Sequence, residues 1–193
     1  MISIGREFGS GGHAIAEELS RRFALPLYDS NLLEHIAREK NVEQNAYEKY
    51  DEQPRNRIFY RTVRGYSNSP QENVANLQFE MLRKMADEGK SFVVTGRCSE
   101  TVLKEYPALV SVFVLGDIPC KQKRVMEKYG LSSEEALLMM KREDRKRKSY
   151  HNYYCKGDWG DSRTYDLTIN SSKLGIEGTA EMLESYIRER MGM

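Results

Sequence analysis

The residues with the clearest chemical signal are four glycines between positions 5 and 12, where a short apolar segment leads into a helical one. The segment 2–4 reads Ile-Ser-Ile, and residues 5–13 continue as Gly-Arg-Glu-Phe-Gly-Ser-Gly-Gly-His. A strand that turns through glycines into a helix directs backbone N–H groups and the positive end of the helix dipole at one point in space. The sequence therefore predicts an anion-binding loop, made of Gly9, Ser10, Gly11, Gly12 and His13.

This loop departs at one place from the G-x-x-x-x-G-K-[ST] pattern that binds phosphate in many proteins. When Gly9-Ser10-Gly11 is aligned with the last glycines of that pattern, Gly12 stands at the lysine position. Arg6 is a candidate replacement, because a guanidinium binds phosphate through two parallel hydrogen bonds. A tight turn that holds no ligand is the alternative interpretation.

Five short apolar segments are expected to form strands, at 2–4, 25–28, 91–95, 109–115 and 166–169. Segments with helical periodicity separate them, and this alternation is typical of an α/β fold with a mainly parallel sheet. The third and fourth strands are apolar on both faces, as buried parallel strands are.

Helices are expected near 71–88 and 176–190, and two further stretches depart from the alternation. Residues 41–70 are polar, contain scattered tyrosines, and read as an inserted helical element or lid more than as sheet-building chain. Residues 130–164 read as a basic helix followed by an irregular polar segment at 151–163. Long excursions of this kind in a compact domain tend to be functional.

The composition indicates one domain with no overall preference for polyanions. The chain has 193 residues, 30 Lys and Arg against 29 Asp and Glu, and a mean hydropathy of -0.68. It has no apolar run of membrane-spanning length, and it opens on a core strand, so we expect a cytoplasmic protein without a signal peptide. Cys98, Cys120 and Cys155 form neither a disulfide framework nor a zinc pattern, and the three histidines show no spacing of a metal triad.

Taken in order, these segments resemble the cytidylate kinase-like branch of the P-loop nucleoside-monophosphate kinases, with a variant phosphate loop that lacks the usual lysine. The resemblance covers nearly the whole chain and is carried by the loop at 2–12, Tyr28-Asp29, Thr95-Gly96-Arg97, Arg124, the run 144–147 and the segment 165–171. It implies a three-layer α/β/α sandwich around a five-stranded, mainly parallel sheet. It also implies one domain over residues 1–193, with a helical acceptor-binding insert at 41–90 and a lid at 130–164.

The resemblance implies a role for each matching residue. Residues 9–13 would wrap the donor phosphates, and Ser171, Ser172 and Lys173 would hold the donor base. Asp29 would lie near the acceptor phosphate and Mg²⁺, with Ser10 as a second metal ligand. Arg97 would hold the acceptor. Catalytic roles would fall to Asp29 and to the arginines around the transferred phosphoryl group, which are Arg6, Arg124, Arg145 and Arg147.

The physical chemistry of the residues agrees with these roles and leaves alternatives open. Ligands of open α/β sheets bind beyond the carboxyl ends of the strands, where Asp29 and Arg97 fall. Residues 121–148 hold ten basic and five acidic residues, an excess suited to a polyanion. Asp29 could instead cap the next helix, Arg97 could pair with Glu100, and the basic run 141–148 could be a solvated face.

The leading hypothesis is a Mg²⁺-dependent kinase that moves the γ-phosphoryl of ATP or another nucleoside triphosphate to a small phosphorylated acceptor, such as the nucleoside monophosphate CMP. A nucleotide-binding sensor or scaffold without turnover is the main alternative, because the lysine is missing. Nucleic-acid binding through residues 141–148 is a weaker one. We expect nucleotide partners, no membrane, and an insert that could serve a homo-oligomer contact.

Overall fold

The computed structural model describes residues 1–40, 62–63, 66–67 and 69–192. In chain order the elements are β1 (Ile2–Arg6), α1 (Gly12–Phe23), β2 (Leu27–Tyr28), α2 (Leu32–Lys40), β3 (Thr62–Val63), β4 (Tyr66–Ser67), α4 (Pro70–Asp87), β5 (Val93–Thr95), α5 (Ser99–Val102), β6 (Val110–Leu115), α6 (Ile118–Tyr129), α7 (Ser133–Tyr154), the 3-10 turn η1 (Ser162–Thr164), β7 (Leu167–Asn170) and α8 (Gly175–Met191).

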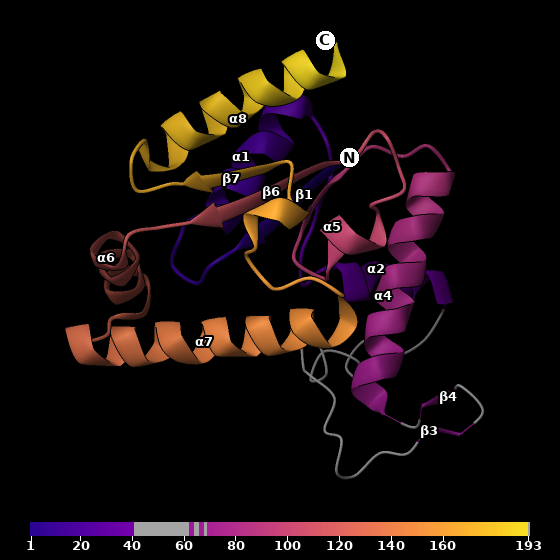
Figure 1. Ribbon diagram of the computed structural model, residues 1–193, viewed down its shortest axis with the longest axis horizontal. Coiled ribbons are helices and arrows are strands. Elements are labelled where there is room, and N and C mark those ends of the chain that lie inside the picture. The colour runs from indigo at the N-terminus through magenta and orange to yellow at the C-terminus, as the bar shows by residue number, and fades with distance from the viewer. Residues whose placement is uncertain (41–61, 64–65, 68, 193) are drawn as a thin grey trace.

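The central sheet has five strands in the order β2-β5-β1-β6-β7 (Figure 1). Every neighbouring pair in it is parallel, so the expected mainly parallel sheet is fully parallel. β1 lies in the middle, with Ile4 opposite Thr95 of β5 and Val112 of β6. The carboxyl end of β1 therefore opens at the centre of the sheet, where the glycine-rich loop begins.

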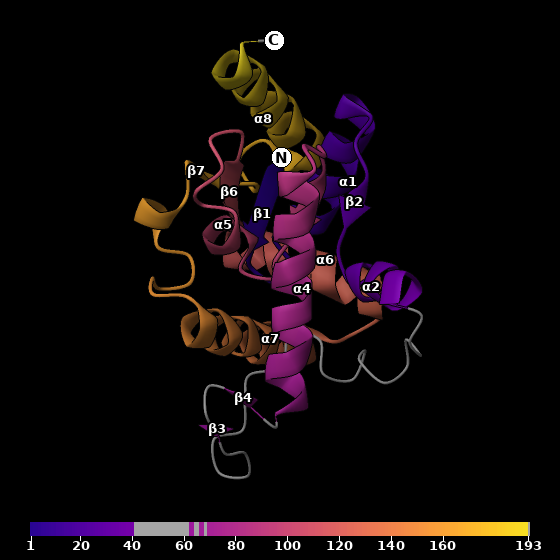
Figure 2. The same cartoon turned by 90° about the vertical axis from the view of Figure 1, so that its right-hand side faces the viewer.

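Helices cover both faces of this sheet and bury its apolar strands. One cluster joins the strands to α1 and α8 through residues such as Ile15 and Leu183. A second cluster joins the opposite face to α2 and α4 through Leu32 and Leu82. Figure 2 shows α8 and α4 on separate sides of the sheet. The arrangement is the three-layer α/β/α sandwich that the sequence predicts.

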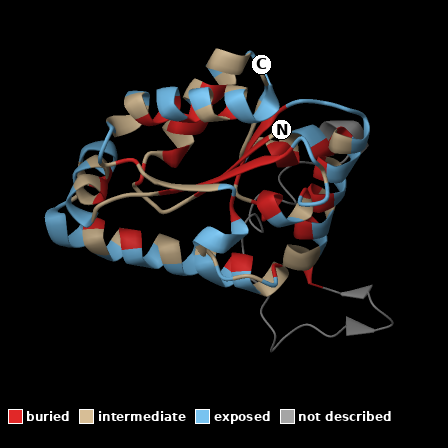
Figure 3. Cartoon of the chain, turned by 45° about the horizontal axis from the view of Figure 1, so that its top comes forward, coloured by how far each residue is buried: buried red, intermediate tan, exposed pale blue. Residues whose placement is uncertain are grey.

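The expected boundary of the lid helix is corrected by the structure. Residues 151–154 were assigned to an irregular segment, yet α7 runs through them to Tyr154. Ser132 and Glu135 form a capping box at its start. At its end, the ring of Tyr150 lies 4.9 Å from that of Tyr154, inside a small apolar cluster, and this packing extends the helix. Figure 3 shows that most of the rest of α7 is exposed or half-buried.

The expected insert is described only in part. Residues 41–61, which form its first part, lie outside the described residues. Beyond them, β3 and β4 form a short antiparallel pair in a stretch for which we expected no sheet. α4 occupies the expected helix at 71–88. Within the described part of the chain, no helix has both the length and the apolar character to cross a membrane.

Candidate active site

The glycine-rich loop has the backbone geometry of an anion cradle. Gly9 and Gly11 take left-handed φ angles of 79° and 82°, which residues with a side chain adopt only with strain. A Cβ on Gly9 would also lie 2.9 Å from the side chain of Val125. α1 starts at Gly12, so its first N–H groups have no carbonyl of their own helix to bond. The loop therefore presents backbone donors at the positive end of a helix dipole.

Ser10 shapes this loop from the inside. Its hydroxyl donates to the carbonyl oxygen of Glu7 at 2.9 Å and accepts from the N–H of Gly12 at 3.3 Å. The residue is fully buried. The Ser10 hydroxyl therefore bonds within the loop backbone.

A cavity of about 450 Å³ opens over the loop, at the carboxyl ends of β1, β2 and β5. Its walls combine the loop backbone with basic side chains from four different parts of the chain. These basic residues are Arg6, Arg97, Arg124, Lys128 and Arg147. Such a cluster of cations beside backbone donors suits a ligand with several negative charges.

Arg6 occupies the space that a side chain at residue 12 would need. A Cβ on Gly12 would lie 2.6 Å from the Cβ of Arg6 and 3.2 Å from its Cγ. The first distance is too short for two packed carbons, and because both Cβ atoms are attached directly to the main chain, the backbone would have to shift. A glycine at the lysine position and an arginine at the end of β1 are therefore two parts of one arrangement.

Arg124 holds the loop in shape from α6. Its guanidinium donates to the carbonyl oxygens of Ser10 at 3.0 Å and of Gly9 at 3.3 Å. The hydroxyl of Ser171 donates to the same Ser10 oxygen. Arg124 and Ser171 therefore fix the carbonyl side of the loop, while the N–H groups of Ser10 and Gly12 bond within the loop, to the Glu7 carbonyl and the Ser10 hydroxyl.

α7 docks against the loop through Arg147 and Asp144. Arg147 donates to the carbonyl oxygen of Arg6 at 3.1 Å, and its guanidinium lies 5.3 Å from the centre of the Phe8 ring. Asp144 accepts a hydrogen bond of 2.6 Å from the N–H of Phe8. Burial raises the pKa of Asp144, while the Phe8 N–H and Lys121 favour its charged form.

Glu7 and Lys121 form a second support that sequence reasoning missed. Lys121 is 6% exposed, and its ammonium lies 2.9 Å from the carboxylate of Glu7 and 3.8 Å from that of Asp144. Glu7 also accepts from the N–H of Gly116 at 3.1 Å. In the sequence, only the position of Glu7 inside the glycine-rich loop hinted at this role, because its partners Lys121 and Gly116 lie more than 100 residues further along the chain.

Asp29 both caps a turn and faces the cavity. One of its carboxylate oxygens accepts from the N–H of Asn31 at 3.0 Å, in the turn before α2. The other oxygen lies 3.7 Å from Nδ1 of His13. Both residues line the cavity. The capping alternative and the site role are therefore compatible.

Arg97 follows β5 in an uncommon backbone conformation. Its φ is 55°, and that of Cys98 is 53°, in the left-handed region that few non-glycine residues occupy. Arg97 is 3% exposed, donates to the carbonyl oxygen of Thr95 at 3.2 Å and lines the cavity. Strained positions of this kind cluster at functional sites.

The structure brings some expected residues to the cavity and leaves others outside. Arg145 is exposed and does not line it, in contrast to Arg147. Ser172 and Lys173 contact Asp117 instead, at 2.9 Å and 2.7 Å. Lys173 and Asn170 lower the pKa of Asp117. Ile176, just beyond this segment, does line the cavity.

The strand order, the loop after β1 and the cations around it define a P-loop kinase fold with a variant loop. Comparison with known proteins agrees. The model of the cytidylate kinase-like family matches residues 1–173, and the chain belongs to this family. The expectation of this family, and of its α/β fold, is confirmed.

Three similar proteins illustrate the relation. A cytidylate kinase of Pyrococcus horikoshii is 26% identical over 189 residues, which are 97% of this chain and 88% of that protein. The crystal structure of an uncharacterized protein from Eubacterium ventriosum superposes with a TM-score of 0.77 at 39% identity and covers 96% of both chains. A shikimate kinase structure from Bacteroides thetaiotaomicron has a TM-score of 0.56 at 13% identity and covers 97% of both chains, which shows the fold alone.

Proposed function

We propose that this protein is a nucleotide-dependent phosphotransferase that moves the γ-phosphoryl of ATP or another nucleoside triphosphate to a nucleoside monophosphate such as CMP. The observation that carries the proposal is the relation of Arg6 to Gly12. The cation that is missing from the lysine position has a substitute whose side chain begins 2.6 Å from a Cβ at that position. The family supports the same function, since its curated relatives are cytidylate kinases.

Phosphoryl transfer needs in-line positioning and positive charge around the transferred group, and little covalent chemistry from the protein. In our proposal the loop at residues 9–13 binds the donor phosphates through the backbone N–H groups that do not bond within the loop, and Arg124 holds the loop carbonyls away from the phosphates. Arg6 and Arg147 offset the charge that spreads over the transferred phosphoryl group. Arg97 binds the acceptor phosphate.

The donor base would lie near residues 171–173, as the family resemblance implies. Ile176 supports this placement, because it brings an apolar contact to the same end of the cavity. Arg145 does not line the cavity in this structure. It would contact the transferred phosphoryl group only if α7 moved toward the loop when the nucleotides bind.

The site suits Mg²⁺ at Asp29 better than at Ser10. Mg²⁺ prefers oxygen ligands and is usually held by one or two carboxylates together with substrate phosphates. Asp29 has a carboxylate oxygen at the cavity wall, whereas the Ser10 hydroxyl bonds within the loop. When bound, the ion would be held by Asp29 and would offset the negative charge of the phosphates.

The test is a transfer assay with a panel of nucleoside monophosphates, run beside a thermal-shift panel of mono-, di- and triphosphates with and without Mg²⁺. We expect nucleoside diphosphate to form from both donor and acceptor, and the triphosphate to raise the melting temperature by mass action. A triphosphate that stabilises the protein while no acceptor is phosphorylated would favour the sensor or scaffold. Absence of both effects would overturn the proposal.

A further inference from the structure

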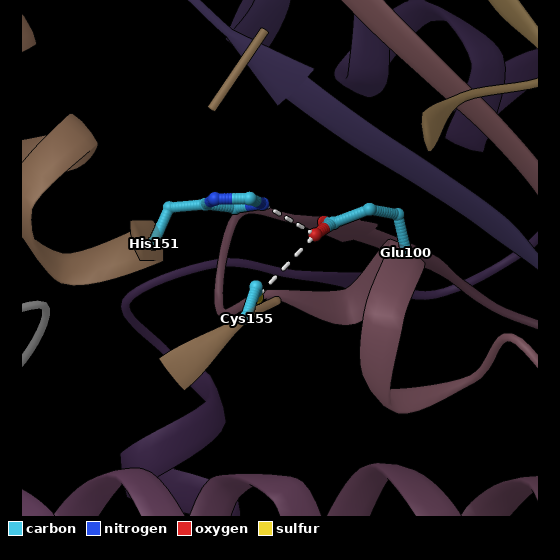
Figure 4. Close-up of side chains that lie close together, drawn as sticks. All are labelled: Glu100, His151 and Cys155. Carbon is cyan, nitrogen blue, oxygen red and sulfur yellow. Dashed lines mark hydrogen bonds and ion pairs between the residues drawn. The ribbon is translucent and has the colours of Figure 1, made fainter. Parts of the chain in front are cut away.

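Three side chains that the proposed transfer does not use meet in the protein interior: Glu100 of α5, His151 of α7, and Cys155 at the end of α7. They are 5%, 5% and 8% exposed. Figure 4 shows the imidazole and the thiol directed at the same carboxylate. A carboxylate, an imidazole and a thiolate are the three protein groups that bind Zn²⁺.

The spacing of the donor atoms suits a small metal ion. Nε2 of His151 lies 2.9 Å from Oε1 of Glu100, and Sγ of Cys155 lies 3.8 Å from the same oxygen. All three donor atoms lie within 4.8 Å of one another. Ligands bound tetrahedrally to Zn²⁺ at about 2.0–2.3 Å are separated by about 3.3–3.8 Å. The His151–Glu100 pair is shorter than this range and must open by roughly half an ångström to hold the ion.

The ring of His151 is oriented to offer Nε2. Its other nitrogen, Nδ1, lies 3.3 Å from Oδ1 of Asn152. The Asn152 side chain is itself held, because Oδ1 accepts from the N–H of Trp159 and Nδ2 donates to Asp158. A hydrogen bond from Nδ1 to an outer oxygen is the usual way to present Nε2 to a metal.

There is room for a fourth ligand on one side. A small cavity of about 30 Å³ is lined by Cys98, Glu100 and His151, together with Arg97 and Arg147. A cavity needs about 10–15 Å³ to hold a water molecule. A water molecule there would complete a set of four ligands.

We propose that Glu100, His151 and Cys155 form a binding site for Zn²⁺ or a similar transition-metal ion, with a water molecule as the fourth ligand. The ion would join α5 to the end of α7. Arg97 lies three residues before Glu100, and Arg147 lies one helical turn before His151, so this link would hold two walls of the phosphate-binding cavity in register. The site is outside that cavity and is separate from Mg²⁺ binding.

The test is metal binding by the full chain, which does not depend on phosphoryl transfer. The protein is stripped with a chelator and titrated with Co²⁺, which gives a thiolate-to-cobalt charge-transfer band and strong visible absorption in a tetrahedral thiolate site. We expect one Co²⁺ per chain, displacement by Zn²⁺, and a higher melting temperature with Zn²⁺. Cys155→Ser and His151→Gln should each weaken Zn²⁺ binding at least about 100-fold, the upper end of what loss of an outer-shell partner causes.

Matched controls are Cys120→Ser and His35→Gln, which change the same residue types outside the cluster and should bind Zn²⁺ as the wild type does. Circular dichroism of the stripped variants establishes that they are folded. The proposal is overturned if the folded wild type binds no stoichiometric Co²⁺ or Zn²⁺. Binding that persists in both Cys155→Ser and His151→Gln would overturn it as well.

Discussion

The carboxylate of Asp144 accepts a hydrogen bond of 2.6 Å from the backbone N–H of Phe8, across 136 residues of chain. This bond ties the middle of α7 to the loop that we propose binds the donor phosphates. This bond therefore couples the geometry of the loop to the position of α7, beside the contacts of Arg147 with Arg6 and Phe8.

We expect Asp144→Ala to lower the free energy of unfolding by about 1.5–3 kcal/mol, the range for a hydrogen bond to a charged group. The substitution leaves the Phe8 N–H without its acceptor. Asp144→Asn keeps an oxygen that can accept the Phe8 hydrogen bond, so its free energy of unfolding should fall by less than that of Asp144→Ala. Urea unfolding measures both.

Glu143→Ala is the matched control, since Glu143 contacts Arg142 and Lys146 at the surface. Surface pairs contribute about 0–1 kcal/mol. If Asp144→Ala and Glu143→Ala were equally stable, the bond to Phe8 would not hold α7 to the loop.

Arg6 and Gly12 should show strong coupling in mutagenesis. Arg6→Gly should lower kcat/KM for transfer at least tenfold, about 1.4 kcal/mol of transition-state stabilisation. Gly12→Lys alone should be harmful, because its Cβ would lie 2.6 Å from that of Arg6. The double variant Arg6→Gly, Gly12→Lys removes this clash and returns a cation to the lysine position, so it should be more active than either single variant.

Glycine is required at residue 6 in this experiment, because alanine would retain the Cβ that causes the clash. Steady-state kinetics of the four proteins gives the coupling energy directly. Additive losses would show that the two side chains do not compete for one space.

Arg147 and Arg145 lie two residues apart on α7 but differ in position. Arg147 lines the cavity and contacts both the Arg6 carbonyl and the Phe8 ring, whereas Arg145 is exposed. We expect Arg147→Ala to lower kcat/KM at least about tenfold, and Arg145→Ala to have a clearly smaller effect. A loss at Arg145 as large as that at Arg147 would instead indicate that α7 moves on closure and brings Arg145 to the phosphates.

The sequence was sufficient for the elements that local pattern encodes. The runs at 91–95 and 109–115 are apolar on both faces, which only a buried strand explains well, and the glycines after β1 have few other uses than a close backbone approach. Strand ends in a parallel sheet meet at one edge, so Asp29 and Arg97 could be assigned to a common cavity without knowledge of the fold's details.

The direction of a side chain, and a contact with a residue far along the chain, could not be predicted from local sequence pattern. Nothing in the sequence indicates that the Ser10 hydroxyl turns inward, or that Lys121 pairs with Glu7. The interior cluster is a further example. We saw no metal spacing in the histidines and cysteines, yet Glu100 lies 51 residues from His151 and beside it in space. Tertiary packing joins these groups, and sequence separation carries no trace of it.

The last prediction concerns acid stability and rests on Glu18, where α1 meets α8. Hydrogen bonds from Arg21 and then from Arg22 lower the pKa of Glu18 to about 2. Arg22 also bonds to Glu184 of α8 at 2.8 Å. Because the folded state binds the Glu18 proton more weakly than the unfolded state, this carboxylate stabilises the fold above its ordinary pKa of 4.5. That contribution is lost as the pH falls from 4.5 toward 2.

Glu18→Gln removes the titrating group, so its melting temperature should be lower than that of the wild type at neutral pH and should converge with it as the pH falls through this window. Other carboxylates titrate in the same range, and for that reason the difference between the two proteins is the quantity to measure. High salt should shrink the difference at neutral pH, since the pair lies near the surface. Two melting curves that stay parallel from neutral pH to pH 2 would show that Glu18 has no lowered pKa in the folded protein.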